Sequence, residues 1–371
     1  MGERVLITGG AGFIGSHLAD ELLAAGYEVR VLDSLLAQVH GRADQPPAYL
    51  SPEVEFIHGD VRDAAAVRQA LSGVHAVFHF AAAVGVGQSM YEMEHYTSIN
   101  ALGTAVLLES IIDRPIEKLI VASSMSIYGE GLYRDSRGNI VPRARRSPEQ
   151  LHAGRWELMD EWGEPLKPVP TSETKLPDIS SIYALGKSDQ EQMALMVGRT
   201  YGFEAVALRF FNVFGPRQAL SNPYTGVLAI FAARLLNDKP PMVFEDGLQR
   251  RDFVSVHDVA RAVRLALKSP GAAGRVLNIG SGRSYMVRDV AARMAQALGK
   301  SIEPEVTGKY RTGDIRHCFA DIATARELLG YEPRTYLEDG LTELVDWLRG
   351  QIAVDRVEQA TRELEKRGLT L

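Results

Sequence analysis

The sequence has little cysteine, no long apolar run and no excess of basic residues. Its single cysteine, Cys318, excludes an internal disulfide framework and any metal site built from several cysteines. The 41 lysines and arginines stand against 47 acidic residues, which argues against a nucleic-acid partner. No apolar run reaches the roughly 18 residues that span a bilayer. The first residues lack the charged and apolar regions of a signal peptide, so we expect a cytoplasmic protein without a membrane partner.

Short apolar runs alternate with helix-length segments along the first 210 residues. This alternation predicts an α/β fold with a doubly wound parallel sheet that is covered on both faces. After Phe211 the predicted strands are short and the helices irregular, which indicates a smaller lobe. We expect strands at residues 4–8, 28–32, 54–58, 76–80, 118–122 and 205–210, and helices at 13–25, 91–113 and 180–201.

One region interrupts this rhythm. Residues 131–176 are rich in charge and proline, contain Trp156 and Trp162, and show no clear period. We interpret the region as an insertion between a strand end and the next helix. A surface elaboration is the simpler interpretation, and a cover over the substrate is the alternative.

A glycine-rich turn follows the first predicted strand and opens the first helix. It reads TGGAGFIG over residues 8–15 and places Gly9, Gly12 and Gly15 where a backbone must turn tightly and approach a diphosphate at a helix N-terminus. Asp33 ends the second strand, where a carboxylate binds an adenosine ribose. Because that carboxylate repels a 2′-phosphate, the pattern favours NAD over NADP. The alternative is an ordinary turn followed by a solvated aspartate.

Tyr183 and Lys187 form the candidate catalytic pair. They lie four residues apart in a predicted helix and therefore share one face of it. An unperturbed tyrosine has a pKa near 10, so it can act as a base only where nearby positive charge lowers that pKa. The hydroxyl of Ser124, at the carboxyl end of the fifth strand, could relay a proton to Tyr183. A surface pair and a capped strand end are the simpler alternatives.

These motifs together resemble the extended short-chain dehydrogenase/reductase family, and within it the NAD-dependent nucleotide-sugar epimerases and dehydratases. The resemblance covers nearly the whole chain apart from the insertion and the tail. It implies an NAD-binding Rossmann domain at residues 1–210, a nucleotide-sugar-binding lobe mainly at 211–350 and interwoven with the first, and a helical tail at 351–371. The motifs are TGGAGFIG, SSMSIYG, YALGK, RFFNVFGPRQ and RRDFVSVHDVA.

The resemblance also implies a role for each matching residue. The expected catalytic residues are Ser124, Tyr183 and Lys187. The cofactor would contact Gly9, Gly12, Phe13, Ile14, Gly15, Asp33, Asp60, Val61, Ala81, Ala82, Ala83, Asn100, Tyr183, Lys187 and Phe210. The substrate would contact Val84, Ser124, Asn212, Val227, Leu228, Arg251, Arg311, Asp314 and Cys318. Arginines suit this second set because they bind phosphates in bidentate fashion.

Two residues that differ from the family pattern limit the reactions that the chain could catalyse. The 4,6-dehydratases carry an Asp-Glu pair directly after the catalytic hydroxyl residue, and this chain has Met125 and Ser126 there. Related decarboxylases use a glutamate, and C3/C5 epimerases a cysteine, at the position of Ser126. Neither Met125 nor Ser126 can act as a general acid or base, so 4-epimerisation or reduction of a 4-ketosugar remains.

The leading hypothesis is 4-epimerisation of dTDP-L-rhamnose to dTDP-6-deoxy-L-talose. Val84 is apolar where glucose-type epimerases carry a lysine, and the small Cys318 would leave the sugar pocket roomy. UDP-glucose/galactose or UDP-glucuronate 4-epimerisation, an NAD(P)H-dependent 4-ketosugar reductase and a non-enzymatic dinucleotide sensor are the alternatives. The resemblance further implies a homodimer through the helices at 91–113 and 180–201. Relatives with paired cysteines in the insertion suggest zinc, but this insertion has none, so we expect no metal.

Overall fold

A sheet of seven parallel strands forms the centre of the molecule in the computed structural model, which describes residues 2–41, 43–224, 226–311 and 313–370. The order is β14-β9-β5-β4-β1-β2-β3, so the winding reverses between β1 and β4, where α/β sheets bind ligands. The predicted doubly wound α/β fold is therefore confirmed. The strands are β1 (Arg4–Thr8), β2 (Glu28–Asp33), β3 (Glu55–His58), β4 (Ala76–His79), β5 (Lys118–Ser124), β9 (Glu204–Phe210) and β14 (Val276–Ile279).

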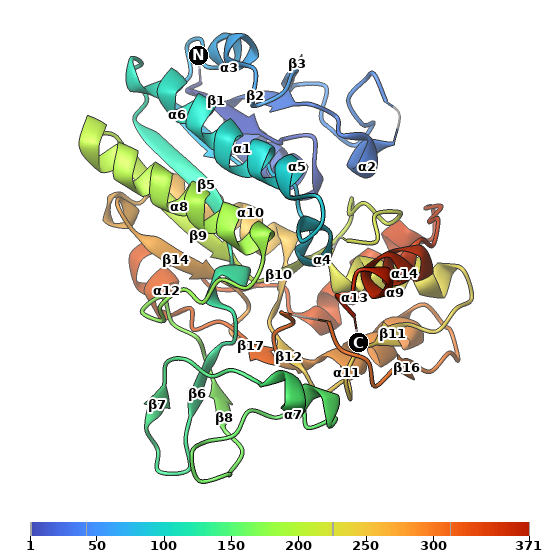
Figure 1. Ribbon diagram of the computed structural model, residues 1–371. Helices are drawn as coiled ribbons and strands as arrows, with labels where there is room; N and C mark the ends of the chain where they lie inside the picture. Colours follow the sequence, from blue (N-terminus) through green and yellow to red (C-terminus); the bar gives the residue numbers. More distant parts are fainter. Residues whose placement is uncertain (1, 42, 225, 312, 371) are drawn as a thin grey trace.

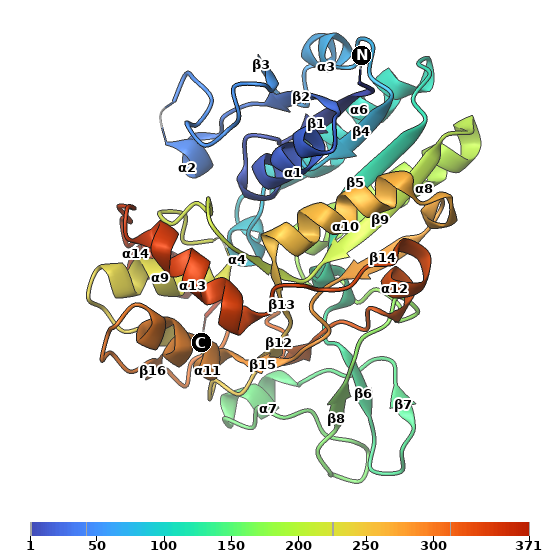
Figure 2. The ribbon, with the colours of Figure 1, turned by 180° about the vertical axis from the view of Figure 1, so that it is seen from behind.

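Helices cover both faces of this sheet. In Figure 2 the face with α1 (Phe13–Ala24) and α10 (Val256–Lys268) is toward the viewer. Figure 1 shows the other face, which is covered by α3 (Ala64–Ala70), α6 (Gly103–Ile112) and α8 (Ile182–Tyr201). Central strands such as β5 are buried along their whole length, because apolar side chains pack on each face.

The helix predicted at residues 91–113 consists of three pieces. It comprises α5 (Met93–Thr97), a π-helical turn η1 (Ser98–Leu102) and α6. Asn100 lies in this π-helical turn and contacts a neighbouring loop. Its Oδ1 accepts from the Ala83 amide at 2.8 Å, and its Nδ2 donates to the Ala83 carbonyl at 3.1 Å. These bonds satisfy the fully buried Asn100 amide. The predicted helix is therefore present without a break, and the π-helical turn within it was not predicted.

The second lobe contains helices and small sheets that lie below the large sheet in Figure 1. The pairs β10-β13 and β11-β16 are parallel, and β12 lies between β15 and β17. The chain also returns to the large sheet, because β14 is its edge strand and α10 covers one of its faces. The strands are β10 (Asn212–Phe214), β11 (Met242–Val243), β12 (Arg250–Arg251), β13 (Phe253–Ser255), β15 (Tyr285–Met286), β16 (Glu305–Val306) and β17 (His317–Cys318).

The remaining helices are short or belong to this second lobe. The tail predicted as helical contains α14, which packs beside α9 in Figures 1 and 2. In the part of the chain that the structure describes, no helix combines the length and apolar character needed to cross a bilayer. These elements are α2 (Ala37–His40), α4 (Val86–Ser89), η2 (Met125–Tyr128), α9 (Val227–Leu236), η3 (Pro270–Ala272), α11 (Val287–Ala297), α12 (Ala323–Leu329), α13 (Leu337–Leu348) and α14 (Val357–Lys366).

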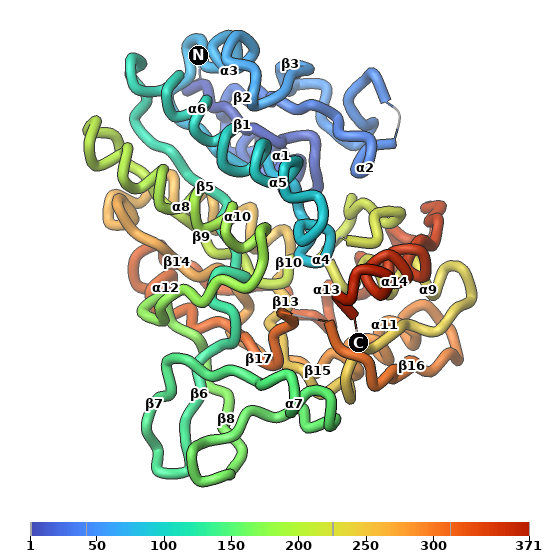
Figure 3. The backbone as a smooth tube through the Cα atoms, viewed as in Figure 1, coloured from blue at the N-terminus to red at the C-terminus, as the bar shows by residue number. Residues whose placement is uncertain are grey.

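The insertion at residues 131–176 forms a small antiparallel sheet with one short helix. The strands β6 (Leu132–Arg134), β7 (Ile140–Val141) and β8 (Lys167–Val169) have the order β7-β6-β8, and α7 (Pro148–His152) follows β7. Its own apolar cluster contains Tyr133, Ala144, Leu158 and Leu166. The tube in Figure 3 shows the small sheet projecting from the rest of the molecule.

Candidate active site between the two lobes

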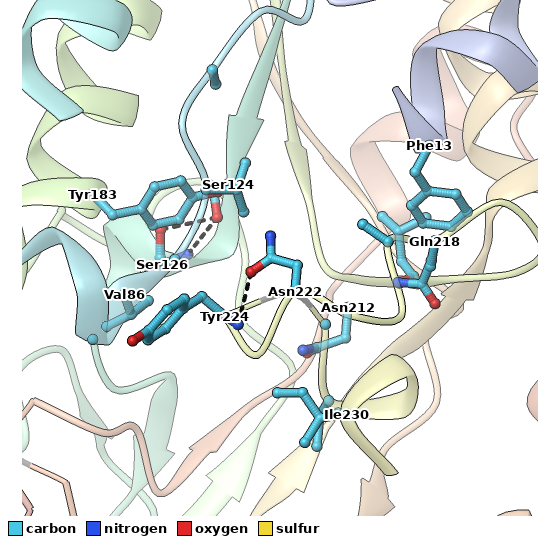
Figure 4. A pocket seen from close by; sticks show the side chains of 18 of the residues that line it. Phe13, Val86, Ser124, Ser126, Tyr183, Asn212, Gln218, Asn222, Tyr224 and Ile230 are labelled. Carbon is cyan, nitrogen blue, oxygen red and sulfur yellow. Dashed lines mark hydrogen bonds between the residues drawn. The ribbon is translucent and has the colours of Figure 1, made fainter. Parts of the chain in front are cut away.

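A cavity of about 620 Å³ lies between the carboxyl edge of the large sheet and the second lobe. Its walls come from the glycine turn, the end of β5, the first turns of α8, the segment 210–231 and the loops of the second lobe. Figure 4 shows ten of the lining side chains by name. Of the residues predicted for cofactor, substrate and catalysis, all line this cavity except Ala83, Asn100 and Cys318.

The turn has no room for side chains in place of its glycines, and their absence leaves space for a ligand. Gly9 has a φ of +72°, and a Cβ there would lie 2.7 Å from the Ala81 amide nitrogen. A Cβ on Gly15 would strike the Gly9 carbonyl. Gly12 caps α1 without any side-chain hydrogen bond, so the first-turn N–H groups at Phe13 and beyond face the cavity free of a side-chain acceptor. Such a helix N-terminus fits a diphosphate.

Asp33 holds a fixed carboxylate at the end of β2. Its Oδ2 accepts from the Ala11 amide at 3.0 Å, and its Oδ1 accepts from the Leu35 amide at 2.9 Å. The carboxylate lines the cavity next to the glycine turn, so it retains lone pairs for the hydroxyl groups of a ribose. Nearby, Arg62 donates to Asp60 at 2.6 Å and lowers the pKa of that carboxyl. Together with the glycine turn, these donors and acceptors fit NAD.

Ser124, Tyr183 and Lys187 all line the cavity. Ser124 Oγ accepts from the Ser126 hydroxyl at 2.9 Å and from the Ser126 amide at 3.2 Å, which leaves its own proton to donate. The Tyr183 ring lies beside Ser124 in Figure 4. Lys187 Nζ donates to the Ala122 carbonyl of β5 at 2.8 Å. Ser181 caps α8 by accepting from the Ala184 amide, which fixes Tyr183 in the first turn.

Burial dominates the electrostatics of the tyrosine and lysine. It raises the pKa of the Tyr183 phenol, and the Ser124 hydroxyl acts in the opposite direction. It lowers the pKa of Lys187 to about 7. Burial therefore disfavours the charged forms of both groups. That Lys187 and a bound, positively charged nicotinamide together favour the phenolate stays a prediction.

The second lobe brings two arginines to the cavity wall. Arg251 donates to the main-chain oxygens of Arg316, at 3.0 Å, and Ile315. The Arg311 guanidinium lies 4.6 Å over the Phe244 ring. Such fixed guanidiniums suit a diphosphate.

Further predicted substrate residues line the same cavity. Among the described residues, Asn212 Oδ1 is buried without a hydrogen-bond partner. Asp314 accepts from Arg311 Nε at 2.9 Å. Val84 is half exposed, and Val227 and Leu228 begin α9 at the cavity wall.

Three predicted residues lie outside the cavity. Cys318 is 1% exposed and belongs to the main core, with its Sγ 3.9 Å from Thr171 Oγ1, so it does not line a sugar pocket. Burial raises the pKa of its thiol to about 12. Ala83 and Asn100 bond to each other behind the cavity wall and hold the loop at Ala81 and Ala82 in place. No residue of the insertion lines the cavity, so the insertion does not cover it.

Several lining residues were missed by the sequence analysis. Ser126 and the loop with Asn222 and Tyr224 also line the cavity, and Figure 4 shows Ser126 close to Ser124. The tail helix α14, for which no chemistry was predicted, contributes Ala360 and Leu364 to the wall. Apolar residues at 357, 360 and 364 repeat at helical spacing and could have indicated a packed face.

The chain is similar to known proteins over most of its length. The family model described as the NAD dependent epimerase/dehydratase family matches residues 5–148 and 160–280. A dTDP-L-rhamnose 4-epimerase from Burkholderia thailandensis is 35% identical over 355 residues, which cover 95% of this chain and 96% of that protein.

Two solved structures show the same arrangement. The crystal structure of UDP-glucose 4-epimerase with UDP-glucose from Thermotoga maritima is 32% identical, with a TM-score of 0.75 over 93% of this chain and 98% of that one. The crystal structure of UDP-glucuronic acid 4-epimerase from Bacillus cereus, in complex with UDP-glucuronic acid and NAD, is 28% identical. Its TM-score is 0.76, over 93% of this chain and 99% of that one.

Proposed function

Because this chain belongs to the NAD-dependent epimerase/dehydratase family and is an NAD-dependent nucleotide-sugar 4-epimerase, we propose that its substrate is dTDP-L-rhamnose and its product dTDP-6-deoxy-L-talose. The family resemblance read from the motifs is thereby confirmed. The similar rhamnose epimerase from Burkholderia thailandensis and the apolar Val84 and Val86 at the cavity support this choice of a 6-deoxy sugar.

Proton transfer is the task of the hydroxyl pair. Tyr183 Oη accepts the proton of the sugar 4-hydroxyl, and the free proton of Ser124 Oγ bonds to the same sugar oxygen. When bound in its oxidised form, NAD supplies the hydride acceptor and the further positive charge that the buried phenol needs. Lys187, fixed on the Ala122 carbonyl, orients that end of the site. After C4 has given up its hydride, the 4-ketosugar turns over. When C4 takes the hydride back on its other face, Tyr183 returns the proton to the sugar oxygen.

The observation that supports a simple epimerisation is the identity of residues 125 and 126. Met125 is 8% exposed and packs in the main core, and Ser126 only donates to Ser124. Neither side chain can remove a proton from C5 or protonate a leaving hydroxyl group. Elimination of water therefore lacks its acid and base, whereas oxidation at C4 needs only a hydride acceptor, which bound NAD would supply, and one base, which Tyr183 would supply.

Purified protein incubated with dTDP-L-rhamnose, UDP-glucose or UDP-glucuronate tests the substrate. We expect the rhamnose nucleotide to give a mixture of C4 epimers without net change in absorbance at 340 nm. Conversion of the UDP sugars alone would reject the rhamnose assignment. Stoichiometric consumption of NADH or NADPH with a 4-ketosugar would instead identify a reductase.

A homodimer through α5, η1, α6 and α8 is also part of this proposal. Large apolar side chains lie exposed on these elements, with Leu102 at 54%, Leu185 at 45% and Met196 at 56% exposure. Leu185 and Met196 lie eleven residues apart and so share one face of α8. Light scattering on the purified protein tests this assembly. The cytoplasmic location and the absence of zinc stay predictions.

A further inference from the structure

A buried cluster of charged side chains joins the insertion to the wall of the cavity. Arg146, from the insertion, and Arg316, next to β17, both donate to the carboxylate of Glu245. The side chains of these three residues are at most 4% exposed. Glu130 lies at the edge of the same cluster, 3.6 Å from Arg146, and accepts from the Arg316 amide at 2.8 Å.

Arg146 makes one contact with each of two cavity-lining segments. Its Nη1 donates to Glu245 Oε1 at 2.6 Å, and Glu245 directly follows Phe244. Its Nη2 donates to the Asp314 carbonyl at 2.8 Å. Phe244 and Asp314 both line the cavity, and both contact the guanidinium of Arg311. One side chain of the insertion therefore fixes the two supports of Arg311.

Arg316 couples the same cluster to the second cavity arginine. Its side chain, fully buried, bonds to Glu157 of the insertion at 3.1 Å and to Asp246 at 2.6 Å. Its main-chain oxygen accepts from Arg251 at 3.0 Å. The guanidiniums of Arg251 and Arg311 are thus both held by groups that the cluster fixes.

The cluster contains more acid than base. Four carboxylates, those of Glu130, Glu157, Glu245 and Asp246, face two guanidiniums. The imidazole of His317 accepts from the Arg250 amide at 3.1 Å through Nδ1, and its Nε2 lies 3.1 Å from Glu157 Oε2. Burial lowers the pKa of this imidazole, against the opposite effect of Glu157. Loss of Arg146 would leave Glu245 with one partner and add negative charge behind the two cavity arginines.

We propose that Arg146 is a positioning residue for the nucleoside diphosphate of the substrate: it orders the segments that present Arg251 and Arg311, and it offsets the acid charge behind them. The proposal rests on the proposed function, since a sugar nucleotide must occupy this part of the cavity. It gives the insertion a role in substrate affinity although none of its residues reaches the cavity.

Four variants of the full chain test the proposal. Arg146→Met removes the charge and both hydrogen bonds, and Arg146→Lys keeps the charge but not the two-armed geometry. Arg146→Met/Glu245→Gln also removes the carboxylate that loses its partner. Arg145→Met is the matched control, because the adjacent Arg145 side chain is 75% exposed and pairs, within the described residues, with Asp178 and not with the buried cluster. Each variant is compared for KM, kcat, NAD content, and the Kd of dTDP and UDP.

We expect Arg146→Met to raise KM and the Kd of dTDP or UDP about tenfold, with kcat within twofold and NAD content unchanged. The Kd and KM of Arg146→Lys should lie between those of the wild type and of Arg146→Met. The double variant should recover part of the nucleotide affinity, and Arg145→Met should have the Kd and KM of the wild type. Unchanged nucleotide affinity in folded Arg146→Met would overturn the proposal. If that variant fails to fold, wild-type affinity in both Arg146→Lys and the double variant would overturn it.

The nucleotide titrations separate this proposal from the proposed function. If the wild type converts no sugar nucleotide but binds dTDP or UDP, the proposed reaction fails and the comparison of Kd values still decides the role of Arg146. If the wild type binds neither nucleotide, both proposals fail.

Discussion

Lys187 Nζ donates to the main-chain oxygen of Ala122 at 2.8 Å, two residues before Ser124 on the same strand. This bond connects α8 to the carboxyl end of β5. Since Tyr183 lies one turn before Lys187 on α8, the bond also sets how the phenol meets the Ser124 hydroxyl. Two elements separated by the whole insertion are thus brought into register at the proposed reaction centre.

Tyr183→Phe should lower kcat by about 10²- to 10⁴-fold, the usual contribution of a general acid–base group. The phenylalanine ring keeps the packing against Ala83 and Tyr96 and removes only the hydroxyl. NAD content, measured by chromatography after denaturation, should not change. Tyr201→Phe, at a 55% exposed position, is the control. Wild-type turnover in Tyr183→Phe would refute the assigned role.

Gly85→Ala should raise KM for the sugar nucleotide more than Gly138→Ala does. Both glycines have positive φ, but Gly138 is exposed. Gly85 has a φ of +148°, and a Cβ would lie 2.7 Å from the Tyr96 hydroxyl and 2.9 Å from Tyr224 Cβ. Gly138 also has positive φ, at +90°, but a Cβ there meets nothing within 4 Å.

Both variants carry a backbone penalty for positive φ, on the order of 1 to 3 kcal/mol. Only Gly85→Ala should also displace Tyr224 from the cavity and raise KM for the sugar nucleotide. Urea unfolding and steady-state kinetics measure the two effects, and equal KM values in both variants would contradict this prediction.

Acid should destabilise the fold through His79. Burial, and to a lesser extent the charge of Lys187, lower the pKa of His79 from 6.5 to about 3. The ring bonds to the hydroxyls of Thr8 and Thr104 at 2.8 Å inside the core. Between these values the unfolded chain binds a proton that the folded chain does not. This stability is complete above pH 6.5 and is lost as the pH falls toward 3.

At pH 5 the loss from this one histidine is about 2 kcal/mol relative to pH 7.5. His79→Gln should therefore flatten the dependence of the free energy of unfolding on pH by up to one proton. Urea titrations at pH 5, 6 and 7.5 measure the slopes. Identical slopes for wild type and variant would show that His79 titrates normally in the folded protein.

The tail helix should stabilise the cavity through Leu364. This side chain is 6% exposed, lines the cavity and packs against the Cα side of Gly87. Leu364→Ala should cost about 2 kcal/mol of unfolding free energy and raise KM, since truncation of a buried leucine leaves a void. Arg362→Ala, on the exposed side of the same helix, should change neither quantity. Equal effects of the two substitutions would show that the tail helix does not contribute to the site.

Much of the sheet could be predicted from the sequence because its signals are local. The strand at residues 4–8 has the predicted bounds, and the glycine turn beside Asp33 lies where the spacing indicated. The insertion could not be predicted in detail, because its two- and three-residue strands are too short to show a period. Its core around Tyr133 forms only when distant segments meet.

The remaining differences come from burial, which sequence spacing does not report. The π-helical turn contains Asn100, whose buried amide bonds to Ala83 in a loop 17 residues earlier. Burial raises the pKa of Tyr183, and the Ser124 hydroxyl lowers it. The position of Cys318 in the core depends on the pairing of β17 with β12, which no local pattern reveals.

The two ends of the inserted sheet leave the molecule side by side, since Leu132 pairs with Val169 across β6 and β8. A hairpin with neighbouring ends can be lengthened at its tip without pulling on the elements that hold it. The turn at Asp135–Asn139 is that tip, and its side chains are exposed or nearly so. A fluorescent reporter spliced into this turn would therefore leave Ser124 and Tyr183 in place, and would make the enzyme visible without labelling either terminus.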